Sequence, residues 1–280
     1  MRRATATVVA LALVGLSAPA GAQRPPYWDA STGCADVFVI GARGSGEVRQ
    51  VSDAELGFGP RAVALLDATA AALPSRGLRV AAASVDYPAI GVDEAARNAF
   101  SFEPDGYSDS VEAGVADLGR LVTAVRTTCS GAVLVLVGYS QGAEVIRTAL
   151  SRGVVVADTD IAAVVLVSDP AFNPADARNG FNLRGSYSPN RTGMRRSILS
   201  LVTPSEIADR TFSLCKAGDI VCQMFHGPLP VALLDWDDAS DIHRSYGLSD
   251  LLSVFQQDVL PLITARVDPV ALGRFIRIPF

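Results

Sequence analysis

The segment Gly138–Gly142 reads Gly-Tyr-Ser-Gln-Gly, the G-x-S-x-G pattern that surrounds a serine nucleophile. It directly follows an apolar run, Ala132–Val137, that predicts a buried strand, and it directly precedes a predicted helix that ends near Leu150. A sharp turn between strand and helix would expose the serine hydroxyl, and the flanking glycines would let neighbouring backbone pass closely. We therefore predict that Ser140 is a nucleophile for acyl transfer rather than part of a simple Gly-Ser loop.

A nucleophilic serine needs a base, and the base needs a group that orients it. The chain contains two histidines, His226 and His243, and both come after Ser140. His226 lies just past Cys222 and close in sequence to Asp219, which leaves it less freedom to reach back. His243, just before the last predicted helix, is therefore the preferred base, and His226 is the alternative.

Asp219 is the preferred acid of such a triad. It lies between Cys215 and Cys222, where a disulfide would hold its carboxylate rigidly. The competing carboxylates are Asp169, Asp235, Asp237, Asp238 and Asp241. Asp169 is the strongest competitor because it follows a predicted strand.

Acyl transfer also needs donors for the developing oxyanion. The backbone N–H of Gln141 is one candidate, because it directly follows the nucleophile. Ser45, in the glycine-rich turn Arg43–Gly46, is the second, since it offers both an N–H and a hydroxyl. This turn lacks the spacing of the common nucleotide-binding motifs, so a phosphate cradle is the weaker interpretation.

The first 22 residues have the pattern of a secretory signal peptide. Arg2 and Arg3 precede the apolar stretch Val8–Leu16, and Ala20–Ala22 forms an A-x-A cleavage site before Gln23. The apolar stretch is too short for a typical spanning helix, although a retained N-terminal anchor is the alternative. No later run offers about 18 uninterrupted apolar residues. We expect secretion and one mature domain, residues 23–280.

Composition excludes several other classes of protein. The chain has 280 residues, of which 49% are hydrophobic and 19% charged, and this balance is typical of a globular protein rather than a disordered one. Its formal net charge of −5 argues against a general nucleic-acid-binding protein, which needs a basic surface.

The four cysteines of an exported protein are expected to form two disulfides. Cys34, Cys129, Cys215 and Cys222 allow three pairings. The short loop between Cys215 and Cys222 can close on itself, which would leave Cys34 for Cys129. A zinc site is the weaker interpretation, because neither pair has C-x2-C spacing and the chain has only two histidines.

Strands and helices alternate through the first 170 residues, which predicts an α/β fold with a mostly parallel sheet. Predicted strands cover 35–42, 78–85, 132–137 and 161–167, and predicted helices cover 60–73 and 108–127. Residues 173–195 are interpreted as a long surface excursion. Strand-like segments at 197–202 and 211–215 follow, and then a closing helix over 248–265 that is broken near Pro261.

Several motifs together resemble those of the cutinase family, and within it the secreted cutinase-like esterases of actinobacteria. They are Cys34-Ala-Asp-Val, Ala42-Arg-Gly-Ser-Gly-Glu47, Gly138-Tyr-Ser-Gln-Gly-Ala143, Asp169-Pro170, Cys215-x-x-x-Asp219-x-x-Cys222 and His243-x-x-Tyr246-Gly247. The resemblance implies a single-domain α/β-hydrolase with a central, mostly parallel five-stranded sheet flanked by helices in three layers. It implies the disulfides Cys34–Cys129 and Cys215–Cys222. It also implies a triad of Ser140, Asp219 and His243, with Ser45 and Gln141 as the oxyanion pair.

The resemblance implies an esterase for short-to-medium acyl esters or lipids that needs neither a metal nor an organic cofactor, and we expect a monomer. The segments 172–210 and 223–242 are longer than the resemblance predicts. They could pack as surface loops or form a flap beside Ser140. The alternatives are a lipase, a phospholipase or an acyltransferase to a cell-envelope sugar, and more remotely a non-catalytic secreted binding protein.

Overall fold

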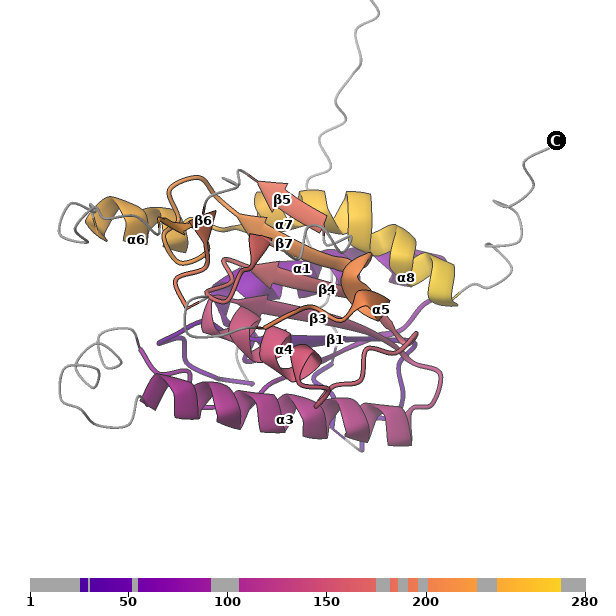
Figure 1. The fold of residues 1–280 in the computed structure, drawn as a ribbon. Coiled ribbons are helices and arrows are strands. Elements are labelled where there is room, and N and C mark those ends of the chain that lie inside the picture. The colour runs from indigo at the N-terminus through magenta and orange to yellow at the C-terminus, as the bar shows by residue number, and fades with distance from the viewer. Residues whose placement is uncertain are drawn as a thin grey trace, which may run out of the picture.

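Six strands form the central sheet of the computed structural model, and every neighbouring pair is parallel (Figure 1). The structure describes residues 26–29, 31–51, 55–91, 106–174, 182–185, 191–195, 201–225 and 236–267. In spatial order the strands are β2 (Val80–Ser84), β1 (Val37–Ala42), β3 (Val133–Tyr139), β4 (Ile161–Val167), β7 (Thr211–Cys215) and β5 (Asn182–Gly185). A second, two-stranded sheet pairs β6 (Arg191–Thr192) with β8 (Met224–Phe225) in antiparallel fashion.

Helices cover both faces of the central sheet. The helical elements of the described residues are α1 (Gly59–Ala72), the 3-10 turn η1 (Pro74–Arg76), α3 (Gly106–Thr128), α4 (Gln141–Ser151), α5 (Ser205–Ala208), α6 (Trp236–Arg244), α7 (Leu248–Val254), the π-helical turn η4 (Phe255–Val259) and α8 (Leu260–Val267). In Figure 1, α3 and α4 lie below the sheet, and α7 and α8 lie above it. Within the described ranges, no helix combines the length and apolar character needed to cross a bilayer.

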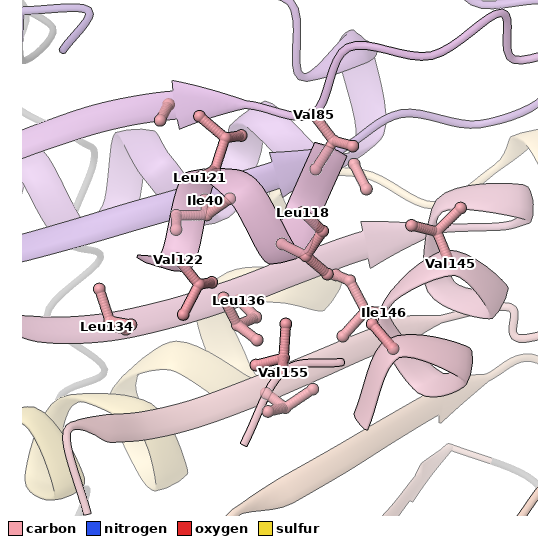
Figure 2. Close-up of a cluster of buried hydrophobic side chains, with 14 of the residues drawn as sticks. Ile40, Val85, Leu118, Leu121, Val122, Leu134, Leu136, Val145, Ile146 and Val155 are labelled. Carbon is pink, nitrogen blue, oxygen red and sulfur yellow. The ribbon is translucent and has the colours of Figure 1, made fainter. Parts of the chain in front are cut away.

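The central strands are buried on both faces because their side chains alternate between two apolar clusters. Leu134 and Leu136 of β3 join the cluster under α3 and α4, where Leu118 and Ile146 also lie (Figure 2). The intervening Val135 belongs to the cluster on the opposite face, together with α1, α7 and α8. This two-sided burial explains the unbroken apolar runs of the sequence. It confirms the predicted three-layer α/β class with a parallel central sheet.

The structure adds detail at both edges of the sheet. The short strand β5 extends the predicted five-stranded sheet at the β7 edge, and it comes from within the segment predicted as a surface excursion. At the other edge Trp28 N–H donates to Ala82 O, and the Trp28 ring packs edge-to-face on Phe38 at 5.5 Å. The segment 26–28 is thus tied to the β2 edge of the sheet.

The predicted break at Pro261 takes the form of a π-helical turn. The turn η4 immediately precedes α8, in which Pro261 is the second residue, and the helical path continues to Val267. A proline removes one hydrogen bond and crowds the carbonyl of the preceding turn, and a wider turn can absorb both effects.

Both expected disulfides are present. Cys34–Cys129 joins the residues just before β1 and just after α3, and Cys215–Cys222 closes the loop that follows β7. The second disulfide encloses Asp219, so the carboxylate lies in a covalently closed loop at the carboxyl end of the sheet.

Two buried ion pairs attach α4 to the segments that follow β4. Arg147 Nε donates to Asp169, and the two side chains are 1% and 0% exposed. Arg195 Nε donates to Glu144 Oε1 at 2.9 Å. A buried charge is costly unless it has a partner, so these pairs constrain the path of the chain beyond β4.

We predict that Asp169→Ala lowers the free energy of unfolding by about 3–5 kcal/mol, because it removes the fully buried Asp169 carboxylate from beside the buried Arg147 guanidinium. Urea unfolding followed by circular dichroism measures this change. The control is Glu112→Ala, which removes the exposed partner of Arg152 and should cost at most about 1 kcal/mol. Equal effects of the two substitutions would contradict the prediction.

Candidate active site

Ser140 occupies the turn between β3 and α4. Its φ of 52° and ψ of −118° lie outside the backbone conformations that residues other than glycine prefer. Its N–H donates to Val167 O at 2.9 Å. A residue persists in such a conformation only where its surroundings enforce it, and such residues are concentrated at active sites. The buried strand before Ser140 and the helix after it provide that enforcement.

The two glycines of the motif allow this turn to form. A Cβ on Gly142 would lie 2.1 Å from the carbonyl oxygen of Ala42, and a Cβ on Gly138 would lie 2.5 Å from the carbonyl oxygen of Gly142. Both contacts are with backbone, which cannot move aside as a side chain can. The first turn of α4 therefore lies directly against the end of β1, where Arg43 begins the glycine-rich turn.

His243 joins Ser140 to Asp219. His243 Nε2 lies 3.1 Å from Ser140 Oγ, and His243 Nδ1 lies 3.2 Å from each carboxylate oxygen of Asp219. The three residues come from the β3–α4 turn, the end of α6 and the disulfide-closed loop. The fold thus brings together the three residues that the sequence singled out as nucleophile, base and acid.

The Asp219 carboxylate is fully buried and has several donors. Val221 N–H donates to Oδ1 at 3.0 Å, while the hydroxyls of Tyr246 and Ser168 donate to Oδ2 at 2.8 and 2.5 Å. Burial raises the pKa of this carboxyl, but the hydrogen bonds from His243, Ser168 and Tyr246 outweigh burial and lower its pKa below the ordinary value. Asp219 is therefore an ionised, acceptor-only group at neutral pH.

Tyr139, the residue before Ser140, supports His243. The two rings stack with centroids 5.1 Å apart and an interplanar angle of 26°, and Tyr139 OH donates to His243 O at 2.9 Å. The variable position before the serine in the motif therefore contacts both the ring and the backbone of the histidine.

The glycine-rich turn is held in place by Glu47. Glu47 Oε2 accepts the Gly44 N–H at 2.7 Å, and Oε1 accepts from Arg61 at 3.0 Å. Ser45 is half-buried in this turn, and the contact of Gly142 with the end of β1 brings the start of α4 beside the same turn. Ser45 and Gln141, the predicted oxyanion donors, therefore belong to two adjoining segments.

The competing site residues lie elsewhere or outside the described residues. The Asp169 carboxylate accepts from Arg147 and from the Ala171 N–H rather than from His243. Asp241 is exposed on α6. His226 and Asp235 lie outside the described residues, as do the side chains of Asp237 and Asp238. Within the described part of the chain, Cys215, Asp219 and Cys222 are close enough to suggest a metal site, but both sulfurs are joined in the disulfide.

The segments 172–210 and 223–242, which are longer than the sequence resemblance predicts, are hydrogen-bonded to each other. β6, from the segment 172–210, pairs with β8, from the segment 223–242, and Met194 N–H donates to Val221 O at 2.9 Å. Arg195 N–H donates to Pro170 O at 2.8 Å, and its guanidinium reaches Glu144, one turn after Ser140. The described parts of both segments are thus attached to the active-site scaffold.

Sequence reasoning missed three contributors to the site, which are Ser168, Tyr246 as a ligand of Asp219, and Glu144. Ser168 and Glu144 had a detectable signal. Ser168 is a polar residue directly after a continuous apolar strand, and Glu144 is a charged residue in the first turn of a buried helix. Their partners could not be read from the sequence, because each contact spans more than 20 positions.

The parallel sheet, the strained serine after β3 and the Ser140–His243–Asp219 contacts define an α/β-hydrolase. The family model for cutinases matches residues 33–233. Among curated proteins, the carboxylesterase Culp1 of Mycobacterium tuberculosis is 30% identical over 222 residues, which are 79% of this chain and 82% of the relative. The chain belongs to the cutinase family, and it is a carboxylic-ester hydrolase.

Solved structures show the same fold at lower identity. A cutinase-like protein from Cryptococcus sp. has a TM-score of 0.57 at 18% identity, with 83% of this chain and 95% of that chain covered. The catalytic core domain of an acetyl xylan esterase from Trichoderma reesei has a TM-score of 0.55 at 20% identity, with 83% and 99% covered. These two similarities show that the fold is shared.

The Glu144–Arg195 pair generates a prediction about pH and stability. Burial raises the pKa of Glu144 to about 7, although Arg195 opposes this shift. Folded Glu144 keeps its proton up to that pH, whereas an unfolded chain releases it near 4.5, so the free energy of unfolding falls as the pH rises between these values. Glu144→Gln should remove this fall, which is at most about 3 kcal/mol.

Urea unfolding at intervals from pH 4.5 to 8 measures the difference between the wild-type protein and Glu144→Gln. Glu112→Gln, which neutralises the exposed carboxylate paired with Arg152, is the control and should follow the wild-type curve. Parallel curves for the wild-type protein and Glu144→Gln would show that this carboxyl does not titrate in that range.

Proposed function

We propose that this hydrolase uses Ser140 as nucleophile, His243 as general base and Asp219 as the acid that orients the base. The observation that carries the proposal is the continuous set of contacts from Ser140 Oγ through the two ring nitrogens of His243 to the Asp219 carboxylate. Nucleophile, base and orienting group within hydrogen-bond reach are the structural signature of covalent acyl transfer.

In the first half-reaction, His243 Nε2 takes the proton from Ser140 Oγ as the oxygen attacks the ester carbonyl carbon. The carbonyl oxygen gains negative charge in the tetrahedral intermediate. The backbone N–H of Gln141, at the start of α4, and Ser45 in the adjoining turn are the proposed donors to this oxyanion. Collapse of the intermediate breaks the ester C–O bond, and the alcohol leaves with the proton from His243.

In the second half-reaction, His243 deprotonates a water that attacks the acyl-enzyme, and the acid leaves as Ser140 recovers its proton. Asp219 stays ionised throughout. Its hydrogen bonds lower its pKa, so the carboxylate is available to stabilise the imidazolium that forms in each step.

We propose esters of short-to-medium acyl chains as substrates of a secreted enzyme. Relatives described as a carboxylesterase and as acetyl xylan esterases support carboxylic esters as the substrate class. The preference for chain length depends on the segments 172–210 and 223–242, whose described parts are tied to the site through β6, β8 and Arg195.

The triad assignment predicts the kinetics of single substitutions on p-nitrophenyl esters of increasing chain length. Ser140→Ala and His243→Ala should each lower kcat by about 10⁴- to 10⁶-fold, because nucleophile and base act as one unit. His226→Ala is the matched control and should stay close to the wild-type rate. Circular dichroism checks that each variant is folded.

Several outcomes would overturn parts of the proposal. Full activity in Ser140→Ala would exclude the covalent mechanism, and loss in His226→Ala with retention in His243→Ala would reverse the base assignment. Hydrolysis of long acyl chains alone would replace the proposed esterase with a lipase.

We further propose that residues 1–22 are a signal peptide and that residues 23–280 are the mature protein. Expression of the full chain in a secreting bacterial host should release a protein whose N-terminal residue is Gln23, as measured by mass spectrometry. Leu13→Arg, which interrupts the apolar stretch, should keep the protein inside the cell. A released protein that still begins at Met1 would contradict the proposed cleavage.

A further inference from the structure

Ser168 occupies a strained position that matches that of Ser140. It directly follows β4 as Ser140 directly follows β3, and its φ of 51° is close to the 52° of Ser140. Ser168 is fully buried, and its N–H donates to Leu214 O at 2.8 Å. Glycine would adopt this conformation without strain, so the serine side chain carries a conformational cost that its contacts must offset.

The contacts of Ser168 lie within the triad itself. Its Oγ is 2.5 Å from Asp219 Oδ2 and 2.8 Å from His243 Nδ1. The direct distances from His243 Nδ1 to the two Asp219 oxygens are longer, at 3.2 Å each. The hydroxyl of Ser168 therefore lies closer to the acid and to the base than these two groups lie to each other.

The direction of these hydrogen bonds follows from the number of protons available. A hydroxyl has one proton to donate, and an ionised carboxylate can only accept. Ser168 therefore donates to Asp219, and a lone pair of its oxygen faces His243 Nδ1. The ring nitrogen must then be the donor, as its longer contacts with the Asp219 carboxylate also require, which places the proton of the neutral imidazole on Nδ1. His243 Nε2 is left unprotonated toward Ser140, as a general base requires.

We propose that Ser168 is a positioning residue that holds His243 in the tautomer able to accept the Ser140 proton, with the Ser168 hydroxyl as a bridge between Asp219 and Nδ1. This inference rests on the proposed function of the triad and extends it by a fourth side chain. Ser168 acts through His243 and does not contact the substrate in this role.

The tautomer can be measured directly by nitrogen-15 NMR, because the two nitrogens of a neutral imidazole have different shifts when one is protonated. The chain has only two histidines, and His226→Ala identifies the signals of His243. The neutral ring of His243 should carry its proton on Nδ1 in the wild-type protein. In Ser168→Ala and Ser168→Gly, the population that carries it on Nε2 should rise measurably, although Asp219 remains an acceptor 3.2 Å from Nδ1.

The two variants separate the hydroxyl from the strain. Both remove the hydroxyl, but glycine also relieves the positive φ, so a shared effect belongs to the lost bridge. Both should lower kcat about 10- to 100-fold with KM changed less than about threefold, because substrate binding does not involve Ser168. They should also shift the acidic limb of the kcat/KM profile to lower pH, since the imidazolium loses its nearest acceptor.

Tyr246→Phe is the matched control. It removes another donor to the same Asp219 oxygen without touching His243 Nδ1, so the ring should keep its proton on Nδ1. If both Ser168 variants keep the Nδ1 proton and a kcat within twofold of the wild-type value, the proposal is wrong. The NMR measurement needs no turnover, so failure of this inference and failure of the triad proposal can be told apart.

Discussion

The close backbone contact between the start of α4 and the end of β1 is the constraint on which the rest of the site depends. A Cβ on Gly142 would overlap the carbonyl of Ala42, so the second residue of α4 can only be glycine. This contact accompanies the sharp turn that strains Ser140, and it brings the start of α4 beside the glycine-rich turn that contains Ser45. The positions of the nucleophile and of the proposed oxyanion donors thus depend on the same close backbone contact.

The helix that begins at this contact also organises the later part of the chain. Arg147 and Glu144 lie on α4 and pair with Asp169 and Arg195, which belong to the segments beyond β4. Because Arg147, Asp169 and Glu144 are buried, each pair fixes the local path of the chain more strictly than a surface pair would. The same helix therefore positions the nucleophile and anchors the segments expected to shape the substrate pocket.

Much of this arrangement could be predicted from the sequence, because its signals are local. Continuous apolar runs predicted β1, β3 and β4, and the G-x-S-x-G pattern between a strand and a helix singled out Ser140. The two glycines were expected at positions where backbone passes backbone. The short strand β5, the π-helical turn before Pro261 and the edge contact of Trp28 were not predicted, because each depends on distant partners.

The sequence by itself determined the strands β1, β2, β3, β4 and β7, the nucleophile motif and a short choice of bases, since two histidines follow Ser140. Only the tertiary structure decided how the polar groups share protons. Asp169 and Asp219 both follow strands. The Asp169 carboxylate is paired with the buried Arg147, whereas three hydrogen-bond donors hold the Asp219 carboxylate beside His243. The tertiary structure likewise decided that Ser168 contacts Asp219 and His243. Strand periodicity is a local property, whereas hydrogen-bond partnership depends on which strand ends meet in the folded sheet.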